Sequence, residues 1–360
     1  MVPLTELVDI HDYLREPVSQ TERNKREGLY PYFGATGQIG WIDKYRQDGK
    51  YVILGEDGAP FLDPQKIKAY IVEGKCWINN HAHVLKGKDR ICDDDFLCFA
   101  LNWVDYSDAV SGSTRLKLPQ NMMNKLLIPK PPIEKQCQIA ARLKAQLAEV
   151  EKARKAAERQ LNETSKLADS IILHSMRKNG TEKRLLAEVL EEVKTGIGED
   201  WSKYPTLGAT RNGMAPAKEP PGKIPQRYKP VFPGTVFYNP MRILIGSIAF
   251  VDDDDIPGIT SPDYVVLKGK EHTVDSRWFY YWLRSSLGEQ CINSLARGAV
   301  RERMLFNRLA EGEIELPSYN VQQIASKALA ELKPMRKAIE QQMKEINLMP
   351  TKILSQAFET

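Results

Sequence analysis

The fold of this protein is decided by residues 134–178, which read EKQCQIAARLKAQLAEVEKARKAAERQLNETSKLADSIILHSMRK. This stretch contains no glycine or proline, and its apolar side chains recur at steps near three and four. At about 1.5 Å per residue, a continuous helix of this length measures roughly 65 Å. Gly180 follows, and glycine accepts the left-handed conformation with which helices commonly end. The sequence therefore predicts one long amphipathic helix.

The sequence before this helix is repeated after it, as an internal duplication of the chain. Four segments return in the same order: 30–36 at 204–210, 84–88 at 266–270, 112–115 at 298–301 and 138–140 at 323–325. The first pair reads YPYFGAT and YPTLGAT, and the second reads VLKGK in both copies. The shift between the copies changes only slightly from one match to the next. Matches that keep their order at a nearly constant shift indicate a domain duplication with short loop insertions.

Each copy has the same internal plan. We expect a globular unit at residues 1–133, a helix at 134–183, a second globular unit at 184–319 and a second helix at 320–360. The globular units contain short apolar runs broken by glycine and proline, which is typical of mixed α/β structure with more strand than helix. The predicted fold class is α+β: two globular mixed α/β units in a pseudo-twofold duplicated chain, separated by two long helices that pair antiparallel as a coiled coil.

Two features of the second helix qualify this plan. Pro334 and Pro350 are expected to kink or interrupt it, because proline lacks the amide hydrogen that an interior helical position donates. The apolar stripes also fit an oligomerisation coiled coil, which periodicity alone does not exclude. The duplication favours pairing within one chain, since a chain that carries both helices can bury the apolar stripe of one against that of the other.

Net charge, cysteine content and the lack of long apolar runs indicate the kind of partner and the cell compartment that we expect. The chain has 360 residues, and its 51 Lys and Arg against 47 Asp and Glu leave a net charge of +4, so an acidic partner must be met by a local basic surface. Five cysteines without regular spacing favour a reducing compartment. The N-terminal segment carries Glu6 instead of a basic signal-peptide head, and no apolar run of about 18 residues occurs. We expect a cytoplasmic, soluble protein.

Common catalytic motifs are missing from the sequence. There is no phosphate loop ending in Gly-Lys-Ser or Gly-Lys-Thr. His81 and His83 alternate as on one strand face, but the sequence offers them no convincing third metal ligand. Asp63, Glu73 and Lys75 have the spacing of some Mg²⁺-dependent nucleases, a common arrangement of these residue types. We therefore predict no catalytic residue and no metal site.

A run of four acidic residues, Asp252 to Asp255, is a further candidate. Adjacent carboxylates repel one another unless a cation joins them. We interpret the run as a solvated turn.

Basic, polar, glycine-containing loops are the positive signal. Small residues let a backbone approach a phosphate, while Arg and Lys neutralise the phosphate or reach a guanine edge. Such loops precede both long helices and occur again at the two YP-x-x-GAT segments. The predicted DNA-binding residues are Thr36, Gly37, Gln38, Gly112, Ser113, Thr114, Arg115, Lys117, Thr210, Arg211, Asn212, Arg227, Arg297, Arg301 and Arg303. Two equivalent sets predict a bipartite reader of double-stranded DNA.

At this point the sequence resembles the DNA specificity subunits of type I restriction-modification systems. The resemblance rests on four segments in order: YFGATGQIGWID at 32–43, VILGEDGA at 52–59, GST at 112–114 and IPKPPIEKQCQIA at 128–140. It extends over essentially the whole chain. It implies two target recognition domains that each read half of a split site, with the two helices as a spacer.

The resemblance also implies partners and the absence of catalysis. In that family the subunit itself is not an enzyme and binds no cofactor; it docks two methyltransferase subunits and, through them, ATP-dependent restriction subunits. S-adenosylmethionine, ATP and Mg²⁺ are then used by the partners. The segments at the helix starts give the docking candidates Pro131, Pro132, Glu134, Gln136, Pro317 and Gln323. Two alternatives stay open: a coiled-coil scaffold without sequence-specific DNA binding, and a stand-alone Mg²⁺-dependent nuclease.

Overall fold

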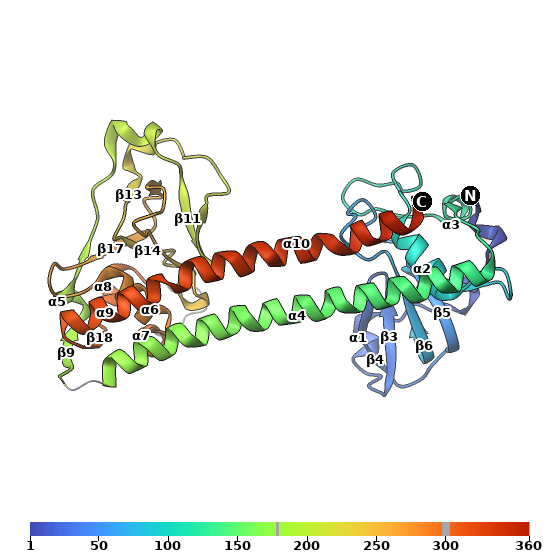
Figure 1. Ribbon diagram of the computed structural model, residues 1–360, viewed down its shortest axis with the longest axis horizontal. Coiled ribbons are helices and arrows are strands. Elements are labelled where there is room, and N and C mark those ends of the chain that lie inside the picture. Colours follow the sequence, from blue (N-terminus) through green and yellow to red (C-terminus); the bar gives the residue numbers. More distant parts are fainter. Residues whose placement is uncertain (178–179, 297–302, 360) are drawn as a thin grey trace. The chain divides into compact units, whose positions relative to one another are not determined.

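The computed structural model describes residues 1–177, 180–296 and 303–359. The chain forms two compact units: unit 1 is Met1–Glu158 with Gln341–Thr360, and unit 2 is Arg159–Glu340. The two long helices are α4 (Ile133–Arg177) and α10 (Leu332–Phe358), the latter preceded by α9 (Tyr319–Ala330) (Figure 1). Each unit holds the beginning of one long helix and the end of the other, so the two helices run in opposite directions along the chain. The predicted fold class, a duplicated mixed α/β chain with two long helices, is confirmed.

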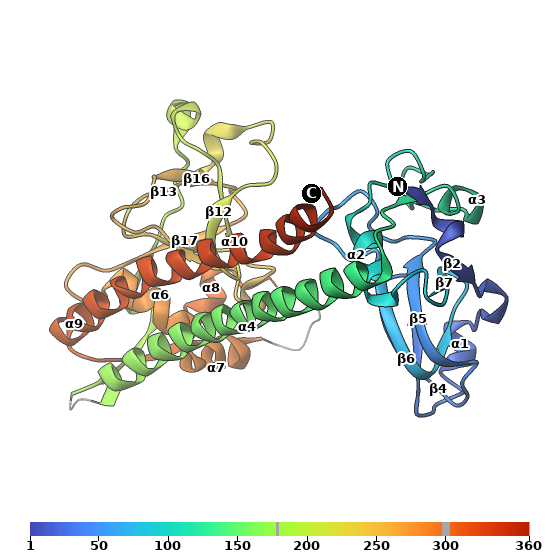
Figure 2. The same ribbon diagram turned by 45° about the vertical axis from the view of Figure 1, so that its right-hand side comes forward.

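Unit 1 is built on a six-stranded sheet. Its strands follow the order β2 (Val8–Ile10), β7 (Ala82–Gly87), β5 (Gln47–Gly55), β6 (Ala69–Ile78), β3 (Tyr30–Gly34) and β4 (Gly37–Ile42), all antiparallel to their neighbours except β3 with β6. Helix α2 (Asp94–Trp103) covers one face (Figure 2). Val52 and Leu54 point into the core beneath α2, and Ile53 points to a second core on the other face. This alternation is the period-two pattern of a strand buried on both faces.

Short elements complete unit 1. They are η1 (Leu4–Glu6), η2 (Asp12–Leu14), α1 (Gln20–Arg23), α3 (Gln120–Met123) and the pair β1 (Val2–Pro3) with β8 (Leu127–Ile128). Strand β8 leads directly into α4. The end of α10 returns to the same unit, where the Phe358 ring lies 5.5 Å from Phe96 and 5.2 Å from Trp103, centroid to centroid.

Unit 2 repeats this plan on a smaller sheet. Four strands follow the order β10 (Leu190–Glu192), β17 (Val265–Gly269), β14 (Val236–Tyr238) and β15 (Ile248–Phe250), and α6 (Ser276–Arg284) packs against them. Separate pairs are β11 (Leu207–Thr210) with β12 (Gly213–Pro216), β13 (Lys229–Val231) with β16 (Gly258–Thr260), and β9 (Glu182–Leu185) with β18 (Glu313–Leu316). The short helices are α5 (Leu186–Val189), η3 (Gly198–Lys203), η4 (Pro225–Arg227), η5 (Ile243–Ile245), α7 (Ser286–Leu295) and α8 (Phe306–Leu309).

The end of α4 enters the core of unit 2. Ile172 is fully buried there, and Trp278 of α6 donates from Nε1 to the Ser175 hydroxyl at 3.0 Å. Among the described residues, no helix is both long and apolar enough to cross a membrane.

The VLKGK match reflects one repeated backbone constraint. A Cβ atom on Gly87 would lie 2.2 Å from the carbonyl oxygen of Cys92, and one on Gly269 would lie 2.2 Å from that of Val274. Each glycine is the last residue of the strand that precedes the covering helix. The segment between that strand and the helix passes so close to the glycine that no side chain would fit there. The repeated glycine therefore has the same structural cause in both copies.

A buried glutamine fastens the start of α4 to α2. Gln136 is 1% exposed, and its Oε1 accepts from the backbone N–H of Asp93 at 3.0 Å. Its Nε2 donates to the carbonyl oxygens of Ile91 and Pro131, both at 2.9 Å. Asp93 is the N-cap of α2, so one amide joins the start of the covering helix to the start of the long helix.

The same amide recurs in unit 2. Gln322 is fully buried; it accepts from the N–H of Asp275, the N-cap of α6, and donates to Thr273 and Pro317, at 2.9–3.0 Å. Gln322 is therefore the structural counterpart of Gln136. If Gln136 corresponds to Gln322, residue 138 corresponds to residue 324. The predicted match of residues 138–140 with 323–325 is therefore wrong by one position.

The two prolines behave differently. A helix break at Glu331 separates α9 from α10, and Pro334 lies in the first turn of α10. This break is the predicted interruption, because Pro334 offers no N–H to the carbonyl of Ala330, the last residue of α9. Pro350 does not interrupt the helix, since α10 continues through it to Phe358.

The acidic run 252–255 is joined by cations. Lys333 lies 2.9 Å from Asp255 and 3.7 Å from Asp252, and also pairs with Asp254. Arg277 of α6 pairs with Asp252 and lies 3.1 Å from Asp253. Asp252 is buried, so the interpretation as a purely solvated turn is wrong for this residue. The run fastens the first turn of α10 to the segment after β15.

We expect the buried amide to be worth about 3 kcal/mol, because its loss leaves several buried backbone groups without partners. Gln322→Ala should lower the midpoint of thermal unfolding and speed amide hydrogen exchange in α6. Gln323→Ala, the exposed neighbour, is the control and should change neither. Equal exchange in α6 of wild type and Gln322→Ala would contradict this role.

The acidic run should give unit 2 a defined acid sensitivity. Burial raises the pKa of Asp252, but the hydrogen bond from Arg277 and the charge of Lys333 outweigh it and hold this pKa below its usual value. A carboxyl with a lowered native pKa stabilises above its unfolded pKa of about 3.9, and loses this contribution as pH falls further. Lys333→Met should therefore cost about 1 kcal/mol at neutral pH, and this deficit should shrink below about pH 4.

Thermal unfolding across this pH range measures the deficit. Lys327→Met, an exposed cation on α9, serves as the control. A Lys333→Met deficit that is the same in acid as at neutral pH would exclude the carboxylates as its cause.

Candidate nucleic-acid interface

The predicted loop at Gly112–Lys117 is closed upon itself and fastened to the turn after β5. Ser111 and Lys117 exchange both backbone hydrogen bonds, at 3.0 and 2.8 Å. Gly58 donates to the carbonyl of Leu116 at 2.8 Å. Gly112 has φ +101°, and a Cβ atom there would lie 2.5 Å from the carbonyl oxygen of Arg115. The loop conformation therefore requires this glycine.

Two carboxylates hold the basic side chains of this loop. Arg115 Nε lies 2.8 Å from Asp57 Oδ1, and Lys117 Nζ lies 3.6 Å from Glu56 Oε1. Both cations stay more than half exposed, at 59% and 55%. Exposed ion pairs of this kind are weak. The carboxylates therefore position Arg115 and Lys117 at the surface without removing them from reach of a phosphate or a base.

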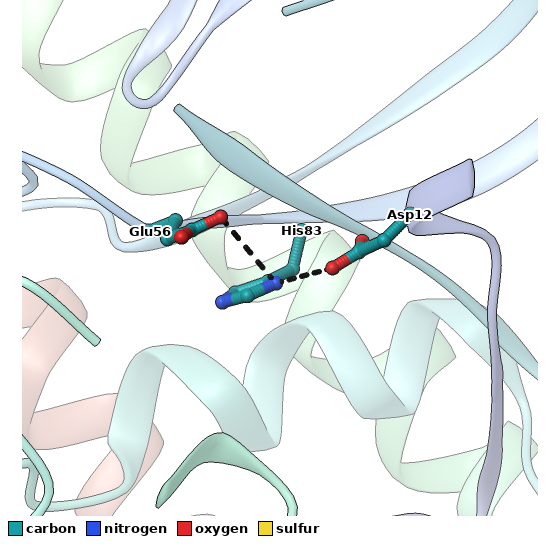
Figure 3. Close-up of side chains that lie close together, drawn as sticks. All are labelled: Asp12, Glu56 and His83. Carbon is teal, nitrogen blue, oxygen red and sulfur yellow. Dashed lines mark hydrogen bonds and ion pairs between the residues drawn. The ribbon is translucent and has the colours of Figure 1, made fainter. Parts of the chain in front are cut away.

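A buried network stands behind the loop (Figure 3). His83 Nδ1 lies 2.7 Å from Asp12 Oδ2, and its Nε2 lies 3.0 Å from the carbonyl oxygen of Leu118. Arg15 bridges the two carboxylates, at 3.0 Å from Asp12 and 2.5 Å from Glu56. Glu56 thus connects this network to Lys117, so the position of the loop depends on groups beneath it.

The network also corrects the interpretation of the histidine pair. Asp12, Glu56 and His83 offer ligand atoms within 4.8 Å of one another, so His83 does have potential co-ligands, which sequence spacing alone did not reveal. His81 is not among them; it lies 3.3 Å from Asp57. A cation at this place would have to displace the Arg15 guanidinium, which already joins the two carboxylates.

The hairpin β3–β4 carries the other predicted loop of unit 1. Gly37 has φ +134°, Thr36 and Gln38 are exposed, and Gln38 Nε2 donates to the carbonyl of Gly40 at 3.1 Å. The carbonyl oxygen of Ala35 lies 3.0 Å from where a Cβ of Gly55 would stand. Gly55 immediately precedes the turn that holds the Gly112–Lys117 loop. The structure therefore brings both predicted loops of unit 1 to the end of β5.

The hairpin β11–β12 is the counterpart in unit 2. Thr210 Oγ1 accepts from the N–H of Asn212 at 3.1 Å and donates to the carbonyl of Gly213 at 2.9 Å. Gly213 has φ +100° and is the counterpart of Gly37, whereas the predicted match of 30–36 with 204–210 would pair Gly37 with Arg211. Arg211 Nε donates to the carbonyl of Ile245 at 2.9 Å.

The remaining predicted DNA-binding residues differ in exposure and contacts. Arg227 is exposed in η4, and Arg303 lies 3.1 Å from Asp263 and is half exposed. Ser113 and Thr114 are exposed in the first loop. Arg297 and Arg301 lie outside the described residues. The predicted counterpart of the Gly112–Lys117 loop in unit 2, residues 298–301, also lies outside the described residues.

The docking candidates divide into exposed and buried groups. Pro132, Glu134 and Gln323 are exposed, and Pro131 is half-buried. Gln136 and Pro317 are buried, and their polar atoms serve the two amide contacts that start the long helices. Gln136 and Pro317 thus contact groups of their own chain, and the docking role stays a prediction for all six residues.

The nuclease-like set is not assembled into one site. Glu73 lies 4.0 Å from Lys50, Lys75 Nζ lies 4.7 Å from the centre of the Tyr45 ring, and Asp63 Oδ1 accepts from the N–H of Gln65. Each group has its own partner.

Known proteins resemble this chain in sequence. A family model described as the type I restriction modification DNA specificity domain matches residues 1–158. The putative type I restriction enzyme specificity subunit S.HindORF215P of Haemophilus influenzae is 32% identical over 143 residues, which are 40% of this chain and 36% of that protein. The EcoprrI specificity subunit of Escherichia coli is 28% identical over 120 residues, 33% of this chain and 28% of its own length. The chain thus spans about a third of the length of these curated relatives.

Solved structures share the fold along the whole chain. The S subunit of the type I restriction-modification system of M. genitalium aligns with a TM-score of 0.54 at 15% identity, over 99% of this chain and 95% of that one. A chain from a study of the assembly and conformational transition of the type I R-M system aligns with a TM-score of 0.63 at 16% identity, over 99% and 96%. Residues 1–158 thus match the model of the type I restriction modification DNA specificity domain, and the chain as a whole shares its fold with the S subunits of these systems.

Proposed function

We propose that this protein is the non-catalytic DNA specificity subunit of a type I restriction-modification complex. The observation that carries the proposal is the family match over residues 1–158 together with the repetition of its key contacts in unit 2. Each unit reads one half of a bipartite site in double-stranded DNA. The long helices set the spacing between the halves.

The proposed partners supply the chemistry. Two methyltransferase subunits dock on the helices and the exposed helix starts, and ATP-dependent restriction subunits join through them. S-adenosylmethionine, ATP and Mg²⁺ belong to those partners, and this chain binds none of them directly. We place the assembly in the cytoplasm, where the DNA is.

Methylation mapping tests this function. The protein is mixed with its adjacently encoded methyltransferase and S-adenosylmethionine, and adenine methylation is mapped across genomic DNA. A single split motif that disappears when this chain is omitted is expected. Methylation that is independent of this chain would instead favour the scaffold alternative.

Arg115→Ala should relax recognition at one half-site. Arg115 is held at the surface by Asp57, and one good side-chain contact to a base discriminates by about 1–3 kcal/mol. The split motif should therefore become degenerate at one or two positions of one half. Lys66→Ala, which removes an exposed cation of the same unit outside the long helices, should leave the motif unchanged.

Arg211→Ala should affect the opposite half of the motif. Arg211 lies in the hairpin turn of unit 2, where it contacts the carbonyl of Ile245. The measurement is the same methylation map, compared position by position with that of Arg115→Ala. Changes in the same half for both variants would contradict the assignment of one half-site to each unit.

A further inference from the structure

Unit 1 contains a cavity of about 910 Å³ that no part of the proposed DNA contact uses. Its walls come from the segment after α2, from the turn before β6, from α3 and from the end of α10. Phe61, Trp103 and Leu354 supply apolar surface, and Lys68 supplies a cation. Its lining also contains four exposed charged residues, Asp105, Asp108, Lys125 and Glu359, so Lys68 is the one charged member that is buried. A cavity of this size with mostly apolar walls and one buried cation has the character of a binding site.

Lys68 is the unusual member of this lining. The residue is only 3% exposed, and no carboxylate of the described chain lies within ion-pair distance of its ammonium group. Burial lowers its pKa, although the more distant charge of Asp63 acts in the opposite direction. Lysines are almost never buried unless they are paired. The Lys68 side chain lines the cavity, and its ammonium group is therefore available to pair with a carboxylate that enters it.

The backbone of Lys68 is held firmly. Asn102 Oδ1 accepts from the N–H of Lys68 at 2.8 Å, and Asn102 Nδ2 donates to the carbonyl of Ala69 at 2.7 Å. The carbonyl of Lys68 accepts from Gly55 at 3.0 Å. The lysine is thus fixed at the start of β6 before any ligand arrives, which reduces the entropy lost on binding.

The surroundings indicate a polypeptide occupant. Met1, Leu62 and Leu127 line the cavity and are exposed, so an occupant that reaches Lys68 also covers large apolar side chains. Asp108 and Glu359, also exposed in the lining, disfavour a free anion with no apolar part. The complementary surface is an amphipathic segment that carries one acidic side chain between apolar ones.

We propose that this cavity receives an acidic side chain of the methyltransferase partner, which pairs with Lys68 while neighbouring apolar residues of the same segment cover Met1, Leu62 and Leu127. This inference rests on the proposed function and adds the chemistry of one contact to it. Lys68 then acts as an anchor for assembly and takes no part in reading DNA.

Affinity for the methyltransferase subunit tests the contact. Lys68→Met keeps the length of the side chain and removes its charge, and calorimetric titration of the full chain should show affinity reduced at least about tenfold. Lys66→Met removes an exposed cation from the same turn and should stay within about twofold of wild type. Thermal unfolding of isolated Lys68→Met should occur at or above the wild-type temperature, because an unpaired buried charge has been removed.

Zero-length cross-linking identifies the acidic group. A carbodiimide joins the Lys68 amine to a carboxylate that contacts it, and takes up the water lost as the amide bond forms. In the complex, mass spectrometry should find Lys68 joined to an Asp or Glu of the methyltransferase. Cross-linking of Lys68 to Asp63 or Glu359 of its own chain in that complex would overturn the proposal.

The outcomes separate this inference from the proposed function. If wild type directs a split methylation motif and Lys68→Met binds the methyltransferase with unchanged affinity, the Lys68 contact is wrong and the function stands. If wild type neither binds the methyltransferase nor directs a motif, both fall. Retention of the motif by Lys68→Met at saturating methyltransferase, together with weakened binding, supports a role in assembly alone.

Discussion

The side-chain amides of Gln136 and Gln322 are the interaction on which the rest of the structure depends. Gln136 joins the N-cap of α2 to the first turn of the long helix α4, and Gln322 joins the N-cap of α6 to the first turn of α9, which precedes the long helix α10; both amides are closed off from water. Backbone groups at a helix start have no partners within the helix, so a buried start needs partners from outside it. One glutamine supplies them and at the same time fixes the direction in which the long helix leaves its sheet.

The candidate recognition loops depend on a second layer of polar contacts. In unit 1 the end of β5 serves as a common support, since the hairpin lies against Gly55 and the basic loop is bound to Glu56 and Asp57. Arg15, Asp12 and His83 stand behind these carboxylates. A rigid support of this kind restricts the positions of the long, flexible side chains of Arg115 and Lys117. Sequence-specific contact with DNA bases requires such restricted positions.

Much of the architecture was predictable because it is written in local patterns. The glycine-free apolar repeat predicted α4, and the VLKGK match predicted equivalent strands because a glycine at each strand end is forced by a crossing chain. Pro334 marked a helix break through its missing amide hydrogen. Backbone rules of this type act over a few residues and therefore remain visible in the sequence.

The candidate sites were harder to predict, because their members come from distant segments. Asp12, Glu56 and His83 meet only through the order of strands in the sheet, and Lys68 faces a cavity whose walls include the end of α10. Gln136 resembled a surface residue because its polarity is typical of exposed helix positions, whereas its burial depends on groups that lie 43 and 45 residues away. No local pattern records such contacts.

The division of the long helices between the units has a consequence for how the protein is made. Residues 341–358 complete the core around Phe96 and Trp103, yet they leave the ribosome after all of unit 2. Until then the apolar surface of unit 1 that α10 covers is open to water, and its closure must wait for a contact of very large sequence separation. The first unit to be synthesised is therefore the last to be finished.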